Sequence, residues 1–544
     1  MQNLRFLSDK KSAVELVISD LVSSGFLSPR FVSYINNLLT LQEGEDYIYL
    51  LLKFVDDEVL AKTIAKVMQR EYGEPVDVDV SVRDIILCSS RQKRCWTFYF
   101  DWNLIDNLLK ANRLGDYKVY QTSFSAFKKV YMELRRDKNP QQKLSQMVRG
   151  EDTGRLIFEY MIEQAYYSNA SDIHIEFVER GGVIRFRIYG NLHVFGVLNN
   201  LQYYSLLNYI KTQIRKTGEP KDKRKDGSIS IKVGGSDLDL RVNIMPAAPY
   251  IDRENTTYER CVIRLLRKSA TLGYSLSRLG ISKEEEDIIR TAVNSSYGMI
   301  LTSGPTSSGK TTTLYAILNT IDAMERKIIT VEDPIEYQNY HLWQQHQVSS
   351  NMSFHEILKG VLREDPDVCL VGEIRDEESA RALVGLASTG HLTFSTIHAN
   401  NSFEVIKRLI DLGVEKQDIY EYGVLFMAQR LLRTACPHCL VERKLNKAEA
   451  LFLGLEGSVI VYDNTGCEKC GWTGTGGERV LVIELFPLFV DEIKEKLHRG
   501  EIYSYRQASK VVEELFGFKN MVKKALDLNM AKKVSISEVL AKVR

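Results

Sequence analysis

Residues 298–313 combine residue types and spacing that suit phosphate binding. A short apolar stretch, residues 299–301, runs into a glycine-rich loop that opens a helical pattern. The pattern G-x-x-x-x-G-K-[ST] is met by Gly304, Gly309, Lys310 and Thr311, with Pro305, Thr306, Ser307 and Ser308 between and Thr312 following. Glycines let successive backbone N–H groups point at phosphate oxygens, and the helix dipole adds positive potential. We expect Lys310 to reach the β- and γ-phosphates and the Thr311 hydroxyl to bind magnesium. The alternative is a chance turn before a helix, which the strand and helix patterns on either side disfavour.

Acidic residues and histidines follow other short apolar stretches. Glu332, Asp333 and Glu336 come after residues 328–331, Glu373 comes after residues 368–371, and His391 and His398 flank residues 393–397. Magnesium needs carboxylates or its hydration water near the loop threonine, and hydrolysis needs an oriented water. Carboxyl ends of neighbouring parallel strands can meet both needs. A single carboxylate or histidine of this kind is usually structural, so the prediction rests on three such groups occurring together.

Four cysteines have the spacing of a metal site. Cys436 and Cys439 form one C-x2-C pair, Cys467 and Cys470 form another, and 27 residues separate them. Four thiolates complete a closed tetrahedral zinc site, whose role is stability. The long separation predicts a folded segment between the pairs. His438 is an alternative ligand, and a redox role for either pair is a second alternative. The other four cysteines, Cys88, Cys95, Cys261 and Cys369, are expected to be ordinary thiols.

Composition sets limits on the protein class. The chain has 544 residues, of which 72 are basic and 71 acidic, so the net charge is +1. This balance gives no reason to expect a nucleic-acid partner. No apolar run approaches the roughly 20 residues of a membrane span, and the N-terminus lacks a secretory signal. We therefore expect no transmembrane segment and a cytoplasmic or peripheral protein.

Patterning divides the chain into three expected domains: 1–145, 150–270 and 275–544. The first is predicted to be mainly helical or mixed, and a polar stretch from residue 135 to 143 is predicted to be a linker. The second alternates apolar and polar residues in two hairpins, with Arg241 and Arg264 on polar faces, where a solvated face is the simpler explanation. Its basic segment at 221–227 is expected to be an exposed loop, with nucleic-acid contact as the alternative. The third alternates strands and helices, which predicts a parallel α/β sheet.

These motifs together resemble one family. The order GPTSSGKTTTLYA, ITVEDPIEY, LREDPDVCLVGEIRD, TGHLTFSTIHAN, AQRLLR, CPHC and CEKC, preceded by SDIHIE and IRFRIYG, resembles the secretion ATPases of type II secretion and type IV pilus assembly. The resemblance covers roughly residues 150–490. It implies a RecA-like α/β core, a PAS-like α+β middle domain, a partner-docking N-terminal domain and a tetracysteine zinc subdomain at 436–470. It also implies a homo-hexamer that uses ATP, Mg²⁺ and Zn²⁺ at the cytoplasmic face of the inner membrane, beside a membrane platform protein.

The resemblance assigns roles to particular residues. Glu336 would activate water, Glu373 would be the Walker B carboxylate, and His391 and His398 would couple nucleotide state to the subunit interface. Arg241 and Arg264 would act as arginine fingers. Three departures stand out: Ser307 in place of a loop glycine, Tyr189 in place of an aspartate, and residues 247–255 in place of a shorter link. If position 307 needs a positive φ, serine is strained there.

The sequence leaves several functions open. Within the family it resembles, retraction ATPases generally lack the tetracysteine motif and the long N-terminal region, so the resemblance implies pilus assembly rather than retraction, with type II secretion as the alternative. A nucleotide-gated scaffold with little turnover, or a nucleic-acid translocase on the same core, are the other hypotheses. The intact Lys310, Glu336 and Glu373 argue against the scaffold, and the neutral charge argues against the translocase.

Overall fold

The chain forms two compact units, Met1–Gly273 and Tyr274–Arg544. In the computed structural model the described residues are 10–24, 26–27, 55–67 and 70–147 (with short gaps before 117), 152–247 and 258–267 (with short breaks), and 275–543 except 337–342, 349–351, 353, 456–458 and 471. The expected domains 1–145 and 150–270 both fall in the first unit, and their separateness stays a prediction.

A seven-stranded sheet forms the centre of the second unit, in the order β14-β13-β15-β16-β12-β17-β20. Four of its strands match the apolar stretches of the sequence and run parallel to one another: β12 (Gly298–Ser303), β13 (Ile328–Glu332), β15 (Val368–Glu373) and β16 (Leu392–Ile397). The predicted parallel α/β sheet is therefore confirmed for this region. Each of these strands is short and apolar because both of its faces are buried.

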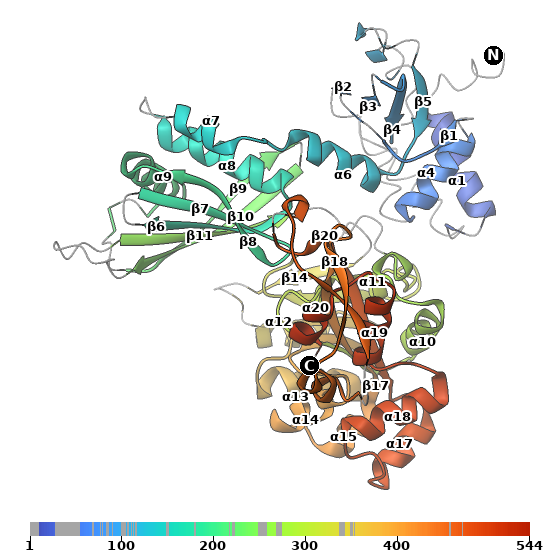
Figure 1. The fold of residues 1–544 in the computed structure, drawn as a ribbon. Helices are drawn as coiled ribbons and strands as arrows, with labels where there is room; N and C mark the ends of the chain where they lie inside the picture. Colours follow the sequence, from blue (N-terminus) through green and yellow to red (C-terminus); the bar gives the residue numbers. More distant parts are fainter. Residues whose placement is uncertain are drawn as a thin grey trace. The chain divides into compact units, whose positions relative to one another are not determined.

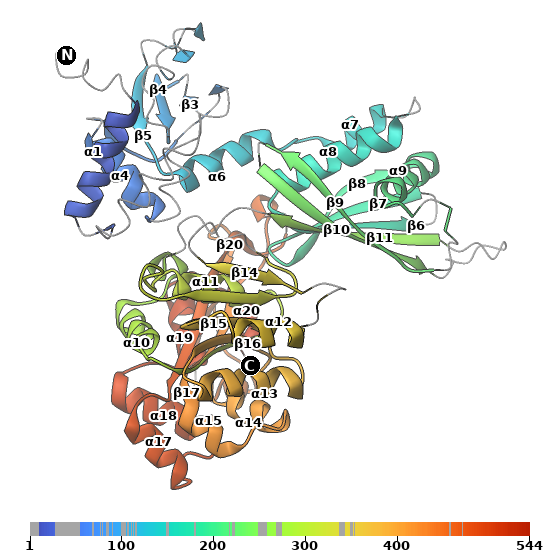
Figure 2. The same cartoon turned by 180° about the vertical axis from the view of Figure 1, so that it is seen from behind.

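Helices cover both faces of this sheet (Figures 1 and 2). Successive residues of β12 belong to different cores, since Met299 and Leu301 pack in one cluster and Ile300 in another. One core is completed by α10 (Lys283–Val293) and α11 (Lys310–Leu318). The other is completed mainly by α12 (Phe354–Val361), α13 (Glu377–Ser388), α14 (Glu404–Asp411) and α15 (Lys416–Tyr422). The edge strand beyond β13 is β14 (Gln344–Gln347).

Two long strands that the sequence patterns did not reveal extend the sheet on its other side. Strand β17 (Gly423–Ala435) pairs in parallel with β12, and β20 (Thr475–Pro487) pairs antiparallel with β17, so the sheet is mixed. The chain between them forms β18 (Leu440–Lys444), α16 (Lys447–Leu453), β19 (Ile460–Asn464) and the 3-10 turn Glu468–Cys470. After β20 the chain ends in four helices: α17 (Asp491–His498), α18 (Tyr505–Phe516), α19 (Met521–Met530) and α20 (Ile536–Lys542).

The first unit contains a six-stranded antiparallel sheet, in the order β8-β7-β6-β11-β10-β9. Both expected hairpins are present: β6 (Ala170–Val178) with β7 (Gly181–Ile188), and β9 (Lys225–Val233) with β10 (Ser236–Ala247). Strands β8 (Asn191–Leu198) and β11 (Tyr258–Arg267) complete the sheet. Helices α8 (Thr153–Tyr167) and α9 (Asn200–Gln213) share its apolar core. Most of the unusual link, residues 248–257, lies outside the described residues.

The N-terminal part holds a small sheet that the helical prediction missed. Its strands follow the order β1-β5-β4-β3-β2 and comprise β1 (Glu71–Tyr72), β2 (Val80–Val82), β3 (Ile86–Ser89), β4 (Arg94–Thr97) and β5 (Lys118–Gln121). The described helices are α1 (Lys10–Ser23), α4 (Asp57–Val67) and α6 (Phe124–Arg135). Of the two expectations for this domain, mainly helical or mixed, the described residues fit the mixed one. Strands of two to four residues are too short to display a period.

The stretch predicted as a linker is packed against its surroundings. Helix α6 ends at Arg135, and α7 (Pro140–Gln146) begins after four intervening residues. Between them, the Arg136 Nε donates to the Tyr167 carbonyl at 3.1 Å, and the Tyr160 hydroxyl donates to Asp137 at 2.7 Å. The linker prediction was therefore wrong. Its polar composition reflects side chains that are bonded to α8.

The predictions for Cys88 and Cys95 and for Lys225 also need correction. Cys88 and Cys95 are register partners on β3 and β4 and form a disulfide, whereas Cys261 and Cys369 are buried free thiols as expected. Lys225, expected in an exposed basic loop, begins β9 and is 1% exposed. Its ammonium lies 2.9 Å from a carboxylate oxygen of Glu259, which also pairs with Lys211. Folding thus buries part of the basic segment as an ionic cluster.

Across the part of the chain that is described, no helix combines the length and the apolar character needed to cross a bilayer.

Candidate nucleotide-binding site and tetracysteine cluster

The glycine-rich loop connects β12 to α11 and has the backbone of a tight phosphate cradle. Gly304 has φ 149°, Gly309 has φ 85° and caps the start of α11, and Ser307 has φ 63°. A left-handed serine is unusual, so the strain expected if position 307 requires a positive φ is present here. The Lys310 ammonium donates to the Gly304 carbonyl at 2.8 Å and to the Pro305 carbonyl at 3.3 Å. Its side chain therefore lies along the loop.

The loop leaves room and polar groups for a phosphate. A Cβ on Gly304 would lie 2.6 Å from the Gln429 carbonyl oxygen and 2.7 Å from the Ser308 Oγ, so no larger residue fits there. The Ser303 and Ser308 hydroxyls are buried and have no hydrogen-bond partner among the residues that the structure describes. Buried hydroxyls without partners are costly, and a bound anion could supply the missing acceptors. These features fit the triphosphate of a nucleotide, with Thr311 at the second position of α11 available to magnesium.

Sheet register brings the loop, a carboxylate and a histidine to one edge. Ser303 aligns with Ile397 on β16, and Thr396 aligns with Glu373 on β15. The end of β12, the end of β15 and the residues after β16 therefore meet at the carboxyl edge of the sheet, where α/β proteins bind ligands. His398 Nε2 lies 2.8 Å from one Glu373 carboxylate oxygen, and the Arg375 Nε donates to the other at 2.7 Å. Glu373 is thus held at both oxygens.

Electrostatics connects these groups with Lys310. Burial lowers the pKa of the Lys310 ammonium, and the carboxylates of Glu373 and Glu336 oppose that shift. Both carboxylates are therefore near enough to act on the same charge. Glu336 is exposed at the end of the segment that follows β13. Glu336 is thus an exposed acid whose charge acts on the half-buried Lys310 ammonium, and its expected role in orienting water stays a prediction.

Glu332 differs from the other carboxylates at this edge. It is 4% exposed and accepts hydrogen bonds from the Tyr315 hydroxyl at 2.6 Å and the Thr330 hydroxyl at 2.7 Å. Burial raises its pKa, which these hydrogen bonds oppose. Tyr315 comes from α11, so this network ties the helix after the loop to β13. The Glu332 carboxylate is therefore bonded within the protein, whereas Asp333 and Glu336 of the same segment are exposed.

The two histidines do not lie together. His391 precedes β16, whereas His398 follows it, so a six-residue strand of about 20 Å separates them. His391 Nδ1 lies 3.0 Å from the Leu386 carbonyl and 3.0 Å from the Thr389 hydroxyl at the end of α13. It lies at the edge of the sheet opposite to Glu373. Only His398 joins the site, and the interface role expected of His391 stays a prediction.

The two arginines of the first unit are neighbours. Arg241 on β10 and Arg264 on β11 are register partners, and both side chains are on the exposed face of the sheet. Arg264 Nε donates to Asp172 at 3.0 Å, although 60% of its side chain remains exposed. Their pairing places both side chains on one face of the sheet, and their expected role as arginine fingers stays a prediction.

The four cysteines of the C-x2-C pairs form one cluster. Their sulfur atoms all lie within 4.8 Å of one another, with Cys436–Cys467 at 3.9 Å, Cys439–Cys470 at 4.0 Å and Cys467–Cys470 at 3.7 Å. A tetrahedron of sulfurs at about 2.3 Å from zinc has edges of about 3.8 Å. The backbone N–H groups of Cys467 and Gly474 lie 3.3 Å from the Cys470 sulfur, which favours a thiolate. This geometry fits zinc, and His438 is not needed as a ligand.

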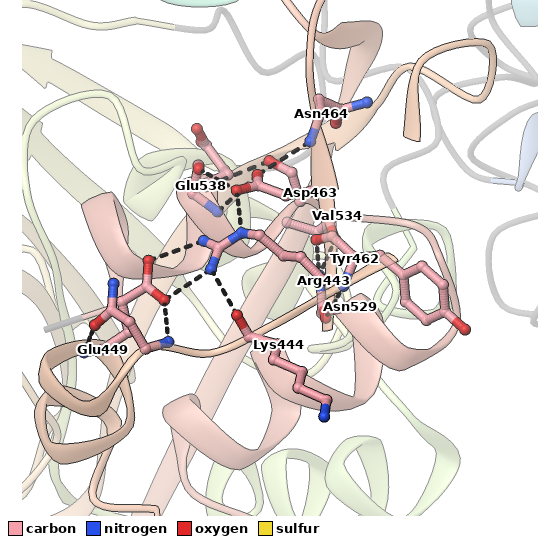
Figure 3. A network of polar contacts seen from close by, with 12 residues as sticks. Arg443, Lys444, Glu449, Tyr462, Asp463, Asn464, Asn529, Val534 and Glu538 are labelled. Carbon is pink, nitrogen blue, oxygen red and sulfur yellow. Dashed lines mark hydrogen bonds and ion pairs between the residues drawn. The ribbon is translucent and has the colours of Figure 1, made fainter. Parts of the chain in front are cut away.

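The folded segment predicted between the pairs is present and well bonded. Figure 3 shows Arg443 of β18 between Asp463 and Glu449, with donor–acceptor distances of 2.7 to 2.9 Å. Asp463 also accepts from the Ser537 hydroxyl at 2.8 Å, and Asn529 donates to the Tyr462 carbonyl at 2.7 Å. Both contacts tie the insertion to the C-terminal helices.

Sequence reasoning missed residues that support the site. Arg375 holds Glu373, Tyr315 holds Glu332, and Gln429 of β17 contacts the loop. Arg375 could have been suspected because it lies two residues beyond a strand-end carboxylate. Gln429 carried no such signal, because it approaches the loop only through pairing of β17 with β12.

Fold and site together define an α/β protein with a phosphate-binding loop geometry at the carboxyl edge of a mostly parallel sheet. The family model described as Type II/IV secretion system protein matches residues 150–540. The chain belongs to this family.

Its relatives bear type II secretion names. Type II secretion system protein E of Dickeya dadantii is 38% identical over 356 residues, covering 65% of this chain and 69% of that protein. The protein of the same name from Aeromonas hydrophila is 40% identical over 342 residues, covering 62% of this chain and 66% of its own length. The alignments thus span about two thirds of the relatives.

A solved structure shares the fold. The Legionella pneumophila ATPase DotB superposes with a TM-score of 0.52 at 21% identity, covering 71% of this chain and 94% of that chain. At this identity the likeness concerns the fold, which is the α/β fold of secretion ATPases.

Proposed function

We propose that this protein is a P-loop ATPase that hydrolyses ATP to ADP and phosphate and couples the reaction to movement in a secretion-family machine. In this proposal the second unit is a RecA-like core and the sheet of residues 150–270 is a PAS-like domain. The observation that carries the proposal is the loop of residues 304–309, whose left-handed residues, buried partnerless hydroxyls and neighbouring Lys310 suit a triphosphate.

Each residue of the site has a distinct task in this proposal. Lys310 and the N–H groups of the loop would neutralise the β- and γ-phosphates, and Thr311 and Glu373 would hold the magnesium ion. Magnesium supplies charge neutralisation when bound. Glu336 orients the attacking water. His398 and Arg375 fix the Glu373 carboxylate, so the direction of that charge is set before substrate arrives.

The arginine pair supports a trans-acting step. Arg241 and Arg264 belong to a different unit from the loop, and their guanidinium groups are exposed. Arginines supplied from outside a phosphate site can raise phosphoryl-transfer rates by about 10³ to 10⁵. A closed ring of six subunits would deliver them to every site and leave no unpaired interface. We therefore propose a homo-hexamer.

The kind of machine that this protein serves is proposed from the family to which the chain belongs. The sequence motifs favoured type IV pilus assembly, with the protein at the cytoplasmic face of the inner membrane beside a platform protein. The names of the relatives support type II secretion about as well. Deletion of the gene would separate the two, since loss of surface pili supports pilus assembly and loss of exported proteins from the medium supports secretion.

The ATPase proposal is tested by phosphate release from purified protein at several concentrations. Lys310→Ala should abolish hydrolysis, and Glu373→Gln should retain ATP binding without turnover, since it removes the charge and keeps the shape. Arg241→Ala should lower turnover far more than nucleotide affinity, and activity per chain should rise as the hexamer forms. Normal hydrolysis by Lys310→Ala would refute the site, and full activity of a monomer would refute the hexamer. Lack of stimulation by DNA would exclude the translocase.

A further inference from the structure

Strand β17 carries a buried glutamine that contacts the glycine-rich loop. Gln429 is 0% exposed and lies on the strand next to β12, where Ala428 aligns with Ser303. Its side-chain nitrogen Nε2 donates a hydrogen bond of 2.7 Å to the Ser308 carbonyl oxygen. The opposite amide orientation would place two oxygen atoms against each other, so this bond fixes which atom faces the loop.

This bond determines where the next N–H group points. In a planar trans peptide, the carbonyl oxygen and the following N–H point in opposite directions. When Gln429 holds the Ser308 oxygen on the side of β17, the Gly309 N–H is directed to the other side. A phosphate cradle needs its N–H groups turned inward and its carbonyl groups turned outward. The bond from Gln429 therefore enforces the orientation that anion binding requires.

The rest of Gln429 limits the loop at both glycines. Its backbone oxygen would lie 2.6 Å from a Cβ at Gly304, and its Nε2 would lie 3.4 Å from a Cβ at Gly309. Gln429 therefore lies close to the loop both at Gly304, where it begins, and at Gly309, where it ends.

The segment of β17 that carries Gln429 is itself anchored. The next residue, Arg430, is 5% exposed and donates to three carbonyl groups, those of Gln429, Asn400 and Lys542, at 2.8 to 3.1 Å. Asn400 belongs to the loop that follows His398. Two consecutive residues of β17, Gln429 and Arg430, therefore hydrogen-bond to the glycine-rich loop and to the loop that follows His398. The strand supports both loops.

We infer that Gln429 is a positioning residue of the nucleotide site: it turns the Ser308–Gly309 peptide so that its N–H faces the bound phosphate. The inference rests on the proposed nucleotide binding at this loop and deepens it. Gln429 contacts the loop without touching the reacting atoms. Its loss is therefore expected to weaken phosphate binding through a misdirected peptide group.

The test measures affinity and stability separately in the full-length protein. Gln429→Met keeps the length and apolar volume of the side chain and removes its donor. We expect about a 10-fold weaker dissociation constant for a fluorescent ATP analogue with Mg²⁺, which corresponds to about 1.4 kcal/mol. Gln429→Glu, which places an acceptor against the Ser308 oxygen, should weaken binding further.

A matched control separates positioning from general destabilisation. Asn529 is another fully buried side-chain amide of the same unit, and it donates to the Tyr462 and Val534 carbonyl groups far from the loop in sequence. Asn529→Leu should lower the melting temperature without nucleotide at least as much as Gln429→Met, yet retain wild-type affinity. Wild-type affinity in Gln429→Met, or an equal loss in Asn529→Leu, would overturn the inference.

The same assay distinguishes failure of this inference from failure of the proposed function. If the wild type binds the analogue and Lys310→Ala does not, the nucleotide site stands, and the Gln429 variants alone decide the inference. If the wild type fails to bind, the proposed function is wrong and the inference falls with it.

Discussion

Replacing Ser307 by glycine should stabilise the second unit. Ser307 is exposed and has φ 63°, a conformation that costs an L-residue about 1–2 kcal/mol relative to glycine. Glycine loses about 0.5–1 kcal/mol through the greater freedom of the unfolded chain. The balance predicts that Ser307→Gly raises the free energy of unfolding by about 0.5–1 kcal/mol.

The neighbouring serine provides the comparison. Ser308 is 3% exposed and is absent from the residues of the loop with positive φ. At position 307 the glycine variant should therefore have a free energy of unfolding about 1 kcal/mol higher than the alanine variant. At position 308 the glycine variant should have a free energy of unfolding about 0.5–1 kcal/mol lower than the alanine variant. Comparing glycine with alanine at each position removes the contribution of the hydroxyl group.

The measurement is differential scanning calorimetry without nucleotide. A difference of 1 kcal/mol corresponds to a shift of about 2–4 °C for a unit of this size. If Ser307→Gly melts no higher than Ser307→Ala, the left-handed backbone at this position is not a source of strain and the reasoning is refuted.

Three further outcomes are expected. Purified reduced protein should contain one zinc per chain by metal analysis, and chelation should expose residues 436–470 to hydrogen exchange while the sheet stays protected; absence of zinc would reject the site. Glu259→Gln should cost about 3–5 kcal/mol of stability in denaturant unfolding, because two buried lysines lose their partner, whereas Glu58→Gln at an exposed helical pair should have a much smaller effect. Tyr189 has φ 49° in the two-residue turn between β7 and β8. Tyr189→Asn should therefore raise the free energy of unfolding by about 0.5–1 kcal/mol in the same assay, and a lower free energy of unfolding would contradict the turn assignment.

The sequence predicted the features that depend on local chemistry. The glycine-rich loop, its strand and its helix follow from a contiguous pattern whose residues act within one turn of backbone. The four parallel strands follow from short apolar runs, because both faces of such strands are buried. The cysteine cluster follows from two pairs whose residue types have few other uses. In each case the residues that define the feature are close together in the chain.

The tertiary structure decided what depends on pairing between distant segments. His391 and His398 look equivalent in sequence, yet the direction of β16 sends only His398 to Glu373. Lys225 lies in a basic run but becomes buried because β9 brings it to Glu259. Gln429 meets the phosphate loop only because β17 pairs with β12. Strand order and register set these contacts, and both arise from burial of whole surfaces, which no local spacing encodes.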